Sequence, residues 1–172
     1  ALSGQNLLQL INDVLDFSKI QAGKMELEIA PFNVREIFEY RVEHFSQSAR
    51  EKGITLSLRV ASGIPERLMG DQYKLRQILF NLVSNSVKFT ESGYVKVELA
   101  LLDKTDTEST IQVSVSDSGI GIPQEMHEKI FAAFKQADAS HSRRYGGSGL
   151  GLNITSRLLK LMGSDIKLWS QT

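Results

Sequence analysis

Two short segments with strand periodicity follow one another in the second half of the chain. Apolar and polar residues alternate over 94–101 and again over 110–116, and only the polar stretch 103–109 separates them. A period of two is typical of strands with one buried face, and so short a connection predicts an antiparallel hairpin. A fold for this chain must therefore contain an antiparallel pair of strands.

The remaining patterns interleave helices with strands. Helical spacing extends from Asn33 to Gly53 and from Asp71 to 89, with a short helix over 123–134 and another over 149–162. Asn33 followed by Glu36 predicts a capping box, and Asp71 predicts an N-cap. Strand patterns occupy 54–60 and 166–170. We therefore predict an α+β fold, an α/β sandwich in which a mixed β-sheet is layered against helices.

One long N-terminal helix is expected to precede this domain. Apolar or small residues recur at alternating spacings of three and four, as in a heptad seam, at Leu8, Ile11, Leu15, Ser18, Ala22 and Met25. Such a seam packs either on the rest of the chain or on a partner helix, and we favour the partner helix. The predicted organisation is a helix with its linker over 1–29 and a globular domain over 30–172.

The composition excludes several classes of protein. The 172 residues include 20 Lys and Arg and 20 Asp and Glu, so no global basic charge favours nucleic acid as the main partner. The absence of cysteine excludes disulfide scaffolds, thiolate zinc sites and cysteine nucleophiles. No apolar run approaches the roughly 20 residues of a membrane span. The opening lacks a secretory signal, and we expect the chain to be an interior piece of a longer protein.

The helix predicted from Asp71 has two distinct faces. Its expected core face comprises Leu75, Leu79, Leu82, Val83, Ser86 and Val87, and a polar stripe follows another face. Asn81 and Asn85 lie one turn apart, and an amide oxygen is a suitable ligand for Mg²⁺ that also takes phosphate oxygens. Lys88, one turn further on, is placed to contact a phosphate. A solvated helix face explains the same pattern, so the stripe alone is weak. Its members are Lys74, Gln77, Asn81, Asn85 and Lys88.

The first glycine loop follows a predicted strand. Asp117 ends that strand and is followed by the sequence SGIGIP over 118–123. A carboxylate in this place can accept a hydrogen bond from an exocyclic amino group such as that of adenine, and glycines let a flat base approach the backbone. An ordinary turn with an aspartate cap is the alternative.

The second glycine loop, over 146–152, opens a predicted helix. Glycines there present backbone N–H groups to an anion at the positive end of the helix dipole. The loop lacks the Gly-Lys-Ser/Thr ending of a P-loop, and no strand precedes it as in a dinucleotide fingerprint. Arg143 and Arg144 are placed to contact terminal phosphates or are solvated loop charges. With the amide pair, Asp117 and a polar segment that can close as a lid, the elements describe a site for Mg²⁺–ATP.

At this point the sequence resembles the sensor histidine kinases, within the group of gyrase, Hsp90, histidine kinase and MutL ATPases. The N, G1, F and G2 boxes of that family are similar to residues 71–90, 117–123, 130–138 and 146–152, in order. The opening residues resemble the second helix of the dimerisation and phosphotransfer domain. The sequence pattern after the linker and in the F box is similar to that of bacterial hybrid kinases. The resemblance implies an ATP-binding catalytic domain over 30–172 whose closing strand is incomplete at Thr172.

The resemblance also implies roles for individual residues. Asn85 would bind Mg²⁺, Asn81 would position phosphate or water, and Lys88 would contact phosphate. The adenine would lie against Phe89 and bond to Asp117. The remaining residues implied in ATP binding are Gly119, Gly121 and Ile122 near the base, Gly147, Ser148, Gly149, Leu150 and Gly151 around the phosphates, and Phe131 and Phe134 as anchors of the lid.

Departures from the family pattern limit the expected activity. The H box is absent, and His44, His127 and His141 lack its context, so this chain carries no phosphoacceptor. Asn153 replaces a small apolar residue. Hydrolytic relatives have a glutamate where Asn81 stands, and an amide is not a usable base, so phosphoryl transfer to an external imidazole fits better than hydrolysis.

The expected function is therefore binding of Mg²⁺–ATP and, in the full-length protein, transfer of the γ-phosphoryl to a histidine of the adjoining dimerisation domain. Expected partners are that domain, a response regulator or receiver domain, and a second kinase chain through the N-terminal helix. The fragment is expected in the cytoplasm, within a membrane-anchored sensor. Two alternatives stay open: an idle or regulatory interaction module, and a gyrase-type ATPase.

Overall fold

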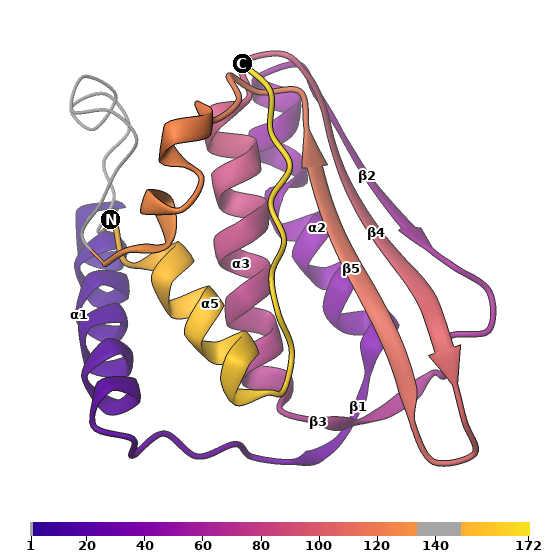
Figure 1. Cartoon of the computed structure of the whole chain (residues 1–172). Helices are drawn as coiled ribbons and strands as arrows, with labels where there is room; N and C mark the ends of the chain where they lie inside the picture. Colours follow the sequence, from indigo (N-terminus) through magenta and orange to yellow (C-terminus); the bar gives the residue numbers. More distant parts are fainter. Residues whose placement is uncertain (1, 134–148) are drawn as a thin grey trace. The chain divides into compact units, whose positions relative to one another are not determined.

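The computed structural model describes residues 2–133 and 149–172, with side chains from residue 11 onward. These residues form two compact units (Figure 1). Unit 1 comprises Ala1–Leu27 and Gly121–Thr172, and unit 2 comprises Glu28–Ile120. Unit 2 is continuous in sequence, whereas unit 1 combines the two ends of the chain.

Unit 2 contains a three-stranded mixed sheet in the order β2-β4-β5. Strand β4 (Gly93–Lys104) pairs in parallel with β2 (Ile54–Val60) and antiparallel with β5 (Ser109–Asp117). The predicted hairpin is therefore confirmed, as is the predicted mixed sheet. The hairpin register places Val95 opposite Asp117, so β5 ends beside the beginning of β4.

A second, two-stranded sheet in unit 2 was not predicted from the sequence. Strands β1 (Ala30–Asn33) and β3 (Arg67–Gly70) pair antiparallel across more than thirty residues of chain. Each has only four residues, and Pro31 lies within β1. Strands this short carry too few residues for a visible alternation, and proline is compatible with the edge of a sheet.

Helices α2 (Val34–Glu51) and α3 (Gln72–Phe89) lie side by side and cover one face of the three-stranded sheet (Figure 1). Of the expected core face of α3, Leu79, Val83, Ser86 and Val87 are buried, and Leu75 and Leu82 are half-buried. Burial of this face turns the opposite stripe of α3 away from the sheet. The core of unit 2 comprises Val34, Ile37, Phe38, Ala49, Ile54, Leu79, Val83, Val87, Val95, Val97 and Leu99.

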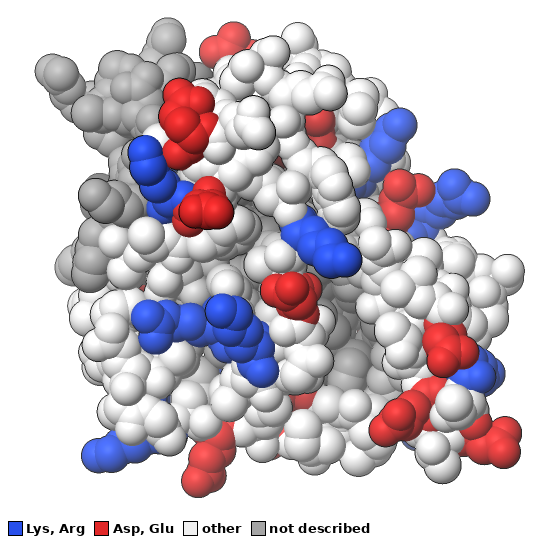
Figure 2. Space-filling view, viewed as in Figure 1, with Lys and Arg blue, Asp and Glu red and all other residues white. Residues whose placement is uncertain are grey.

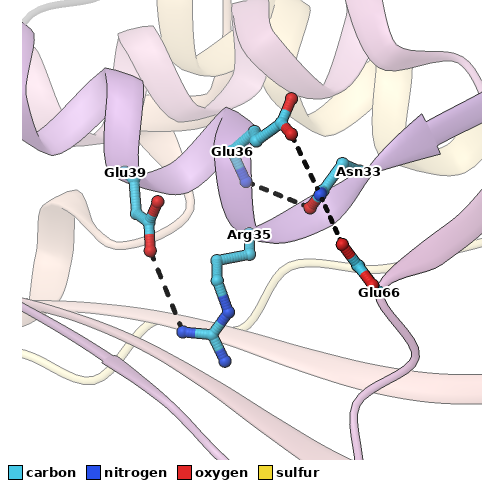
Figure 3. Close-up of polar contacts among 5 residues, drawn as sticks. All are labelled: Asn33, Arg35, Glu36, Glu39 and Glu66. Carbon is cyan, nitrogen blue, oxygen red and sulfur yellow. Dashed lines mark hydrogen bonds and ion pairs between the residues drawn. The ribbon is translucent and has the colours of Figure 1, made fainter.

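Side chains fix the beginning of each of these helices. Asn33 Oδ1 accepts a 3.3 Å hydrogen bond from the Glu36 amide, and Asn33 Nδ2 donates to Glu36 Oε1 at 3.1 Å (Figure 3). The predicted cap is thus confirmed, although Glu36 bonds the Asn33 side chain. At α3, Asp71 Oδ1 accepts from the Tyr73 and Lys74 amides, and Asp71 Oδ2 accepts from the Glu28 amide.

Unit 1 is helical in its described part. It contains α1 (Leu2–Gln21), α5 (Gly151–Leu161) and two short 3₁₀ helices, η1 (Gln124–Met126) and η2 (Lys129–Phe131). Helices α1 and α5 contact each other, and the Arg157 guanidinium lies 5.3 Å from the Phe17 ring centroid. Seam residues Ile11 and Leu15 are 46% and 53% exposed, so α5 does not cover them.

Two predicted elements of unit 1 are wrong. The segment expected to form one helix from 123 to 134 forms η1 and η2 instead, in its described part. Residues 166–170 alternate in polarity but form no strand. Their contact with the G1 loop is a 2.8 Å bond from the Ile122 amide to Ser170 Oγ, and a hydroxyl cannot extend a backbone ladder.

Basic and acidic side chains are interspersed over the face of the molecule shown in Figure 2. This distribution accompanies a formal net charge of zero. None of the helices in the described part of the chain has the length and apolar character needed to cross a bilayer.

Candidate nucleotide-binding site

The C-terminal half of α3 carries the polar stripe predicted from the sequence. Asn81 is buried, with 7% of its surface exposed, and Asn85 and Lys88 are half-buried on the following turns. The Ser84 hydroxyl donates to the Asn81 carbonyl oxygen at 3.2 Å. Partial burial distinguishes this stripe from a fully solvated helix face.

Lys88 lies against the neighbouring aromatic ring. Its Nζ is 4.9 Å from the Phe89 ring centroid, a distance that allows a cation–π contact. Burial lowers the pKa of Lys88 from its usual value of 10.5. A phosphate beside the ammonium would favour its charged form and oppose this shift.

Asp117, at the end of β5, is held through both of its carboxylate oxygens. The Ser86 hydroxyl donates to Oδ2 at 2.9 Å, and the Gly119 amide donates to Oδ1 at 3.0 Å. Ser86 was predicted to lie in the core face of α3, and its bond to Asp117 was not predicted from the sequence. A hydroxyl at an otherwise apolar helix position was the available indication, because a buried hydroxyl needs a partner.

The loop after Asp117 lies against the end of α3. The Ile120 amide donates to the Phe89 carbonyl oxygen at 3.3 Å. A Cβ at position 119 would lie 2.6 Å from that same oxygen, so this approach requires glycine. Unit 2 therefore brings Phe89, Asp117 and Gly119 together at the end of the helix that carries Asn81, Asn85 and Lys88.

The second half of the G1 loop belongs to unit 1. Gly121 has φ of +69°, and a Cβ there would collide with the Gln171 carbonyl oxygen. The Ile122 carbonyl oxygen lies 2.9 Å from His127 Nε2, so this histidine binds the backbone of the loop. Unit 1 thus fixes the conformation of Gly121 and Ile122 through its own C-terminal segment and η1.

The G2 loop also belongs to unit 1 and opens α5. Gly149 adopts φ of +66°, Leu150 is fully buried, and Gly151 is the first residue of the helix. Asn153 Nδ2 donates to the Phe131 carbonyl oxygen at 2.7 Å, which connects α5 to η2 and accounts for an amide at this position. The predicted site residues Phe134, Arg143, Arg144, Gly147 and Ser148 lie outside the described residues.

The donor set fits Mg²⁺ held mainly by a nucleotide. Within the described ranges, no three His, Asp or Glu side chains gather as a metal site. Asn85 offers a half-buried amide oxygen on α3, near Lys88. Mg²⁺ keeps waters and binds substrate phosphates with one or two protein ligands, so a single amide is chemically adequate.

Comparison with known proteins places this geometry in a family. Residues 70–172, more than half of the chain, match the family model of histidine kinase-, DNA gyrase B- and HSP90-like ATPases. The chain belongs to this ATPase family. The matched region begins just before the Asp71 cap of α3 and includes all the predicted site residues.

The relatives narrow the class to sensor histidine kinases. The signal transduction histidine-protein kinase BarA of Escherichia coli (strain K12) is 46% identical over 98% of this chain, and the sensor protein GacS of Pseudomonas syringae pv. syringae is 44% identical over 95%. The chain spans 18% of the length of each of these proteins. The resemblance stated from the boxes is therefore confirmed.

Solved structures agree with the fold. Full-length ShkA in complex with AMPPNP matches with a TM-score of 0.80 and 39% identity, covering 94% of this chain and 32% of ShkA. The histidine kinase ThkA in complex with the response regulator protein TrrA matches with a TM-score of 0.64 and 25% identity. The match covers 92% of this chain and 41% of the ThkA chain. The predicted α+β class is confirmed by these neighbours.

Proposed function

We propose that this chain binds Mg²⁺–ATP and, within a longer protein, transfers the γ-phosphoryl to a histidine on an adjoining helical domain. The observation that carries the proposal is the fixed carboxylate of Asp117, held by Ser86 and Gly119 at the end of the helix that bears Asn85 and Lys88. The hydrogen-bond acceptor proposed for adenine and the side chains proposed for Mg²⁺ and phosphate then belong to the same unit, unit 2.

Each described residue has a distinct task in this proposal. Asp117 accepts a hydrogen bond from the adenine amino group, and Phe89 packs against the base. Lys88 binds phosphate as a point charge. Asn85 holds Mg²⁺, which neutralises charge on the phosphate oxygens when it is bound. Asn81 orients the phosphate or a water.

The G2 loop completes the proposed site. Gly149, Leu150 and Gly151 open α5, and backbone amides at a helix N-terminus favour a phosphate. Gly147, Ser148, Arg143 and Arg144 extend this proposal to the preceding segment. Gly121 and Ile122 contribute backbone near the base.

Phosphoryl transfer is favoured over hydrolysis by the residue at position 81. Hydrolysis needs a group that takes a proton from water, and the Asn81 amide cannot act as a base at neutral pH. Transfer to an imidazole needs mainly positioning and charge neutralisation, which Lys88, Asn85 and Mg²⁺ would supply. The described histidines are His44 on α2 and His127 at the end of η1. Neither lies on the N-terminal helix that resembles the phosphotransfer domain, so the phosphoacceptor is proposed to lie on another domain.

The proposed partners follow from the relatives. ThkA is solved in complex with the response regulator TrrA, and we extend a response regulator or receiver domain to this chain as a partner. Residues 1–29 would belong to a dimerisation and phosphotransfer domain and residues 30–172 to the catalytic domain. The fragment would act in the cytoplasm as part of a membrane-anchored sensor.

Binding is tested by calorimetric titration with ATP, with and without Mg²⁺, on wild type and D117N. Removing the charge of the acceptor should weaken binding at least tenfold, because bonds to charged groups contribute about 1.5–3 kcal/mol. T110N, at the exposed far end of β5, is the control. Equal affinities of D117N and wild type would refute the assigned role of Asp117.

Transfer is tested by mixing the chain with a separate helical-hairpin domain that carries a histidine followed by an acidic residue. Labelled γ-phosphate should appear on that domain and not as free phosphate. Tight ATP binding without transfer would favour the second candidate, an interaction module that pairs through the exposed Ile11 and Leu15 of α1. Steady release of phosphate, lost on changing Asn81, would favour a gyrase-type ATPase.

A further inference from the structure

One lysine from outside the predicted motifs closes the end of the site helix. Lys52 is the C-cap residue of α2, and its ammonium reaches across to the C-terminal end of α3. Its Nζ donates to the carbonyl oxygens of Val87 at 2.7 Å, Lys88 at 2.9 Å and Thr90 at 3.3 Å. The last carbonyls of a helix have no partner within the helix, and a cation there also complements the helix dipole.

The carbonyl group of Phe89, which lies between those of Lys88 and Thr90 in the sequence, has a different partner. The Phe89 oxygen accepts the Ile120 amide at 3.3 Å and lies close to Gly119. Lys52 therefore takes the carbonyls on both sides of Phe89, and the loop after Asp117 takes that of Phe89 itself. The end of α3 is held from one helix and from one loop at consecutive residues.

This division of partners couples Lys52 to the site. The carbonyls that it binds belong to the same turn as the side chains of Lys88 and Phe89. If the ammonium were lost, the end of α3 would fray, since helix ends open readily when their carbonyls lack partners. Fraying would move Phe89 and release the loop that carries Gly119 and Ile120.

We infer that Lys52 is a positioning residue for the nucleotide site, which acts by fixing the end of α3 against the loop after Asp117. The inference rests on the proposed function for its link to ATP. Because the three hydrogens of its ammonium are matched by three carbonyls, Lys52 acts through the backbone of α3 and not on the nucleotide.

The absence of cysteine allows the ammonium to be removed and restored within one variant. In K52C the single thiolate displaces bromide from 2-bromoethylamine, which forms a C–S bond and returns an ammonium at nearly the original length. Iodoethane reacts in the same way with loss of iodide and adds two carbons without the amine. The two products differ in this group alone, and K104M, at the exposed end of β4, controls for loss of a surface charge.

Two readouts apply, both well below the unfolding temperature. We expect the ethylated protein to bind ATP at least about fivefold more weakly than the aminoethylated protein, a usual size for coupling between sites. Hydrogen exchange at the Ile120 amide should also be faster in the ethylated protein. The aminoethylated protein and K104M should match wild type in both measurements.

The outcomes separate this inference from the proposed function. Equal ATP affinity of the two alkylated proteins would overturn the positioning role, even if the ethylated protein unfolds at a lower temperature. Equal exchange at Ile120 would overturn the contact with the loop. Failure of wild type to bind ATP would refute the proposed function, and exchange at Ile120 would then still decide whether Lys52 holds the loop.

Discussion

Ser86 and Gly119 fix the direction of one carboxylate, and this orientation matters at the residue scale. Asp117 is an exposed residue, yet both of its oxygens are bonded within unit 2. A free carboxylate would rotate and lose conformational entropy on binding a base. Preorganisation by a hydroxyl and a backbone amide reduces that loss.

We therefore predict that S86A weakens ATP binding about fivefold, since one hydrogen bond contributes about 1 kcal/mol. The matched control is S84A, which removes a hydroxyl from the same helix, bonded to the Asn81 carbonyl and not to Asp117. Calorimetric titration measures both. An S86A affinity equal to that of S84A would contradict the positioning of Asp117 by Ser86.

Lys88 gives a prediction for pH. Because burial lowers its pKa below 10.5, there is a range below 10.5 in which the unfolded chain holds a proton that the folded chain has released. Stability attributable to Lys88 therefore rises with pH in that range. Bound phosphate favours the ammonium, so ATP binding should take up a proton there and weaken as pH rises.

This proton uptake is measured by calorimetry in two buffers of different ionisation enthalpy. K88R keeps its charge at these pH values, so its binding should show neither the uptake nor the decline in affinity. The same uptake in K88R as in wild type would assign the proton to another group.

At the scale of elements, each helix of unit 2 begins at a residue that the sequence identifies. Asn33 caps α2 with its side chain, and Asp71 caps α3 through two amides while also bonding the Glu28 amide. Caps fix where a helix starts and hence which residues share its faces. In α3, the start fixed by Asp71 directs Ser86 toward Asp117. The same start places Asn81 and Asn85 on the polar stripe.

We predict that N33A destabilises the protein by about 1 kcal/mol, the usual loss of an N-cap. R35A breaks only the 3.9 Å ion pair with Glu39, whose partners are 55% and 56% exposed, and should change stability by at most about 0.5 kcal/mol (Figure 3). Urea unfolding followed by circular dichroism measures both. A larger loss in R35A than in N33A would show that the cap contributes little.

At the scale of the whole molecule, α1 presents apolar side chains outward. Ile11, Val14 and Leu15 are 46%, 42% and 53% exposed, while Phe17 contacts Arg157 of α5. The partner helix predicted from the heptad spacing stays a prediction. Exposed apolar residues gathered along one helix are typical of an association surface.

We predict that the chain self-associates at millimolar concentration and that L15E abolishes this association, because a charge in an apolar contact is costly to bury. L161E, which changes a leucine of α5 that is 41% exposed, should leave association unchanged. Sedimentation velocity distinguishes the species. A monomeric wild type at the highest concentration would refute the association surface.

Much of the fold followed from local sequence patterns. The hairpin of β4 and β5, the caps at Asn33 and Asp71 and the core face of α3 were predicted because their causes lie within a few residues of chain. Strands β1 and β3 were missed, and residues 166–170 were wrongly predicted as a strand. In both cases the outcome depends on a partner distant in the sequence, and periodicity does not report such partners.

The sequence by itself determined the residue types of the site: the amide pair, the carboxylate, the lysine and the glycine loops, since each type has its own chemistry. Only the tertiary structure decided which other groups form hydrogen bonds with these site residues and fix their positions. Ser86 reaches Asp117 across 31 positions, and Lys52 reaches the end of α3 across more than 34. These contacts arise where α2, α3 and β5 pack together, because packing brings hydroxyl, ammonium and carbonyl groups within bonding distance irrespective of their separation along the chain.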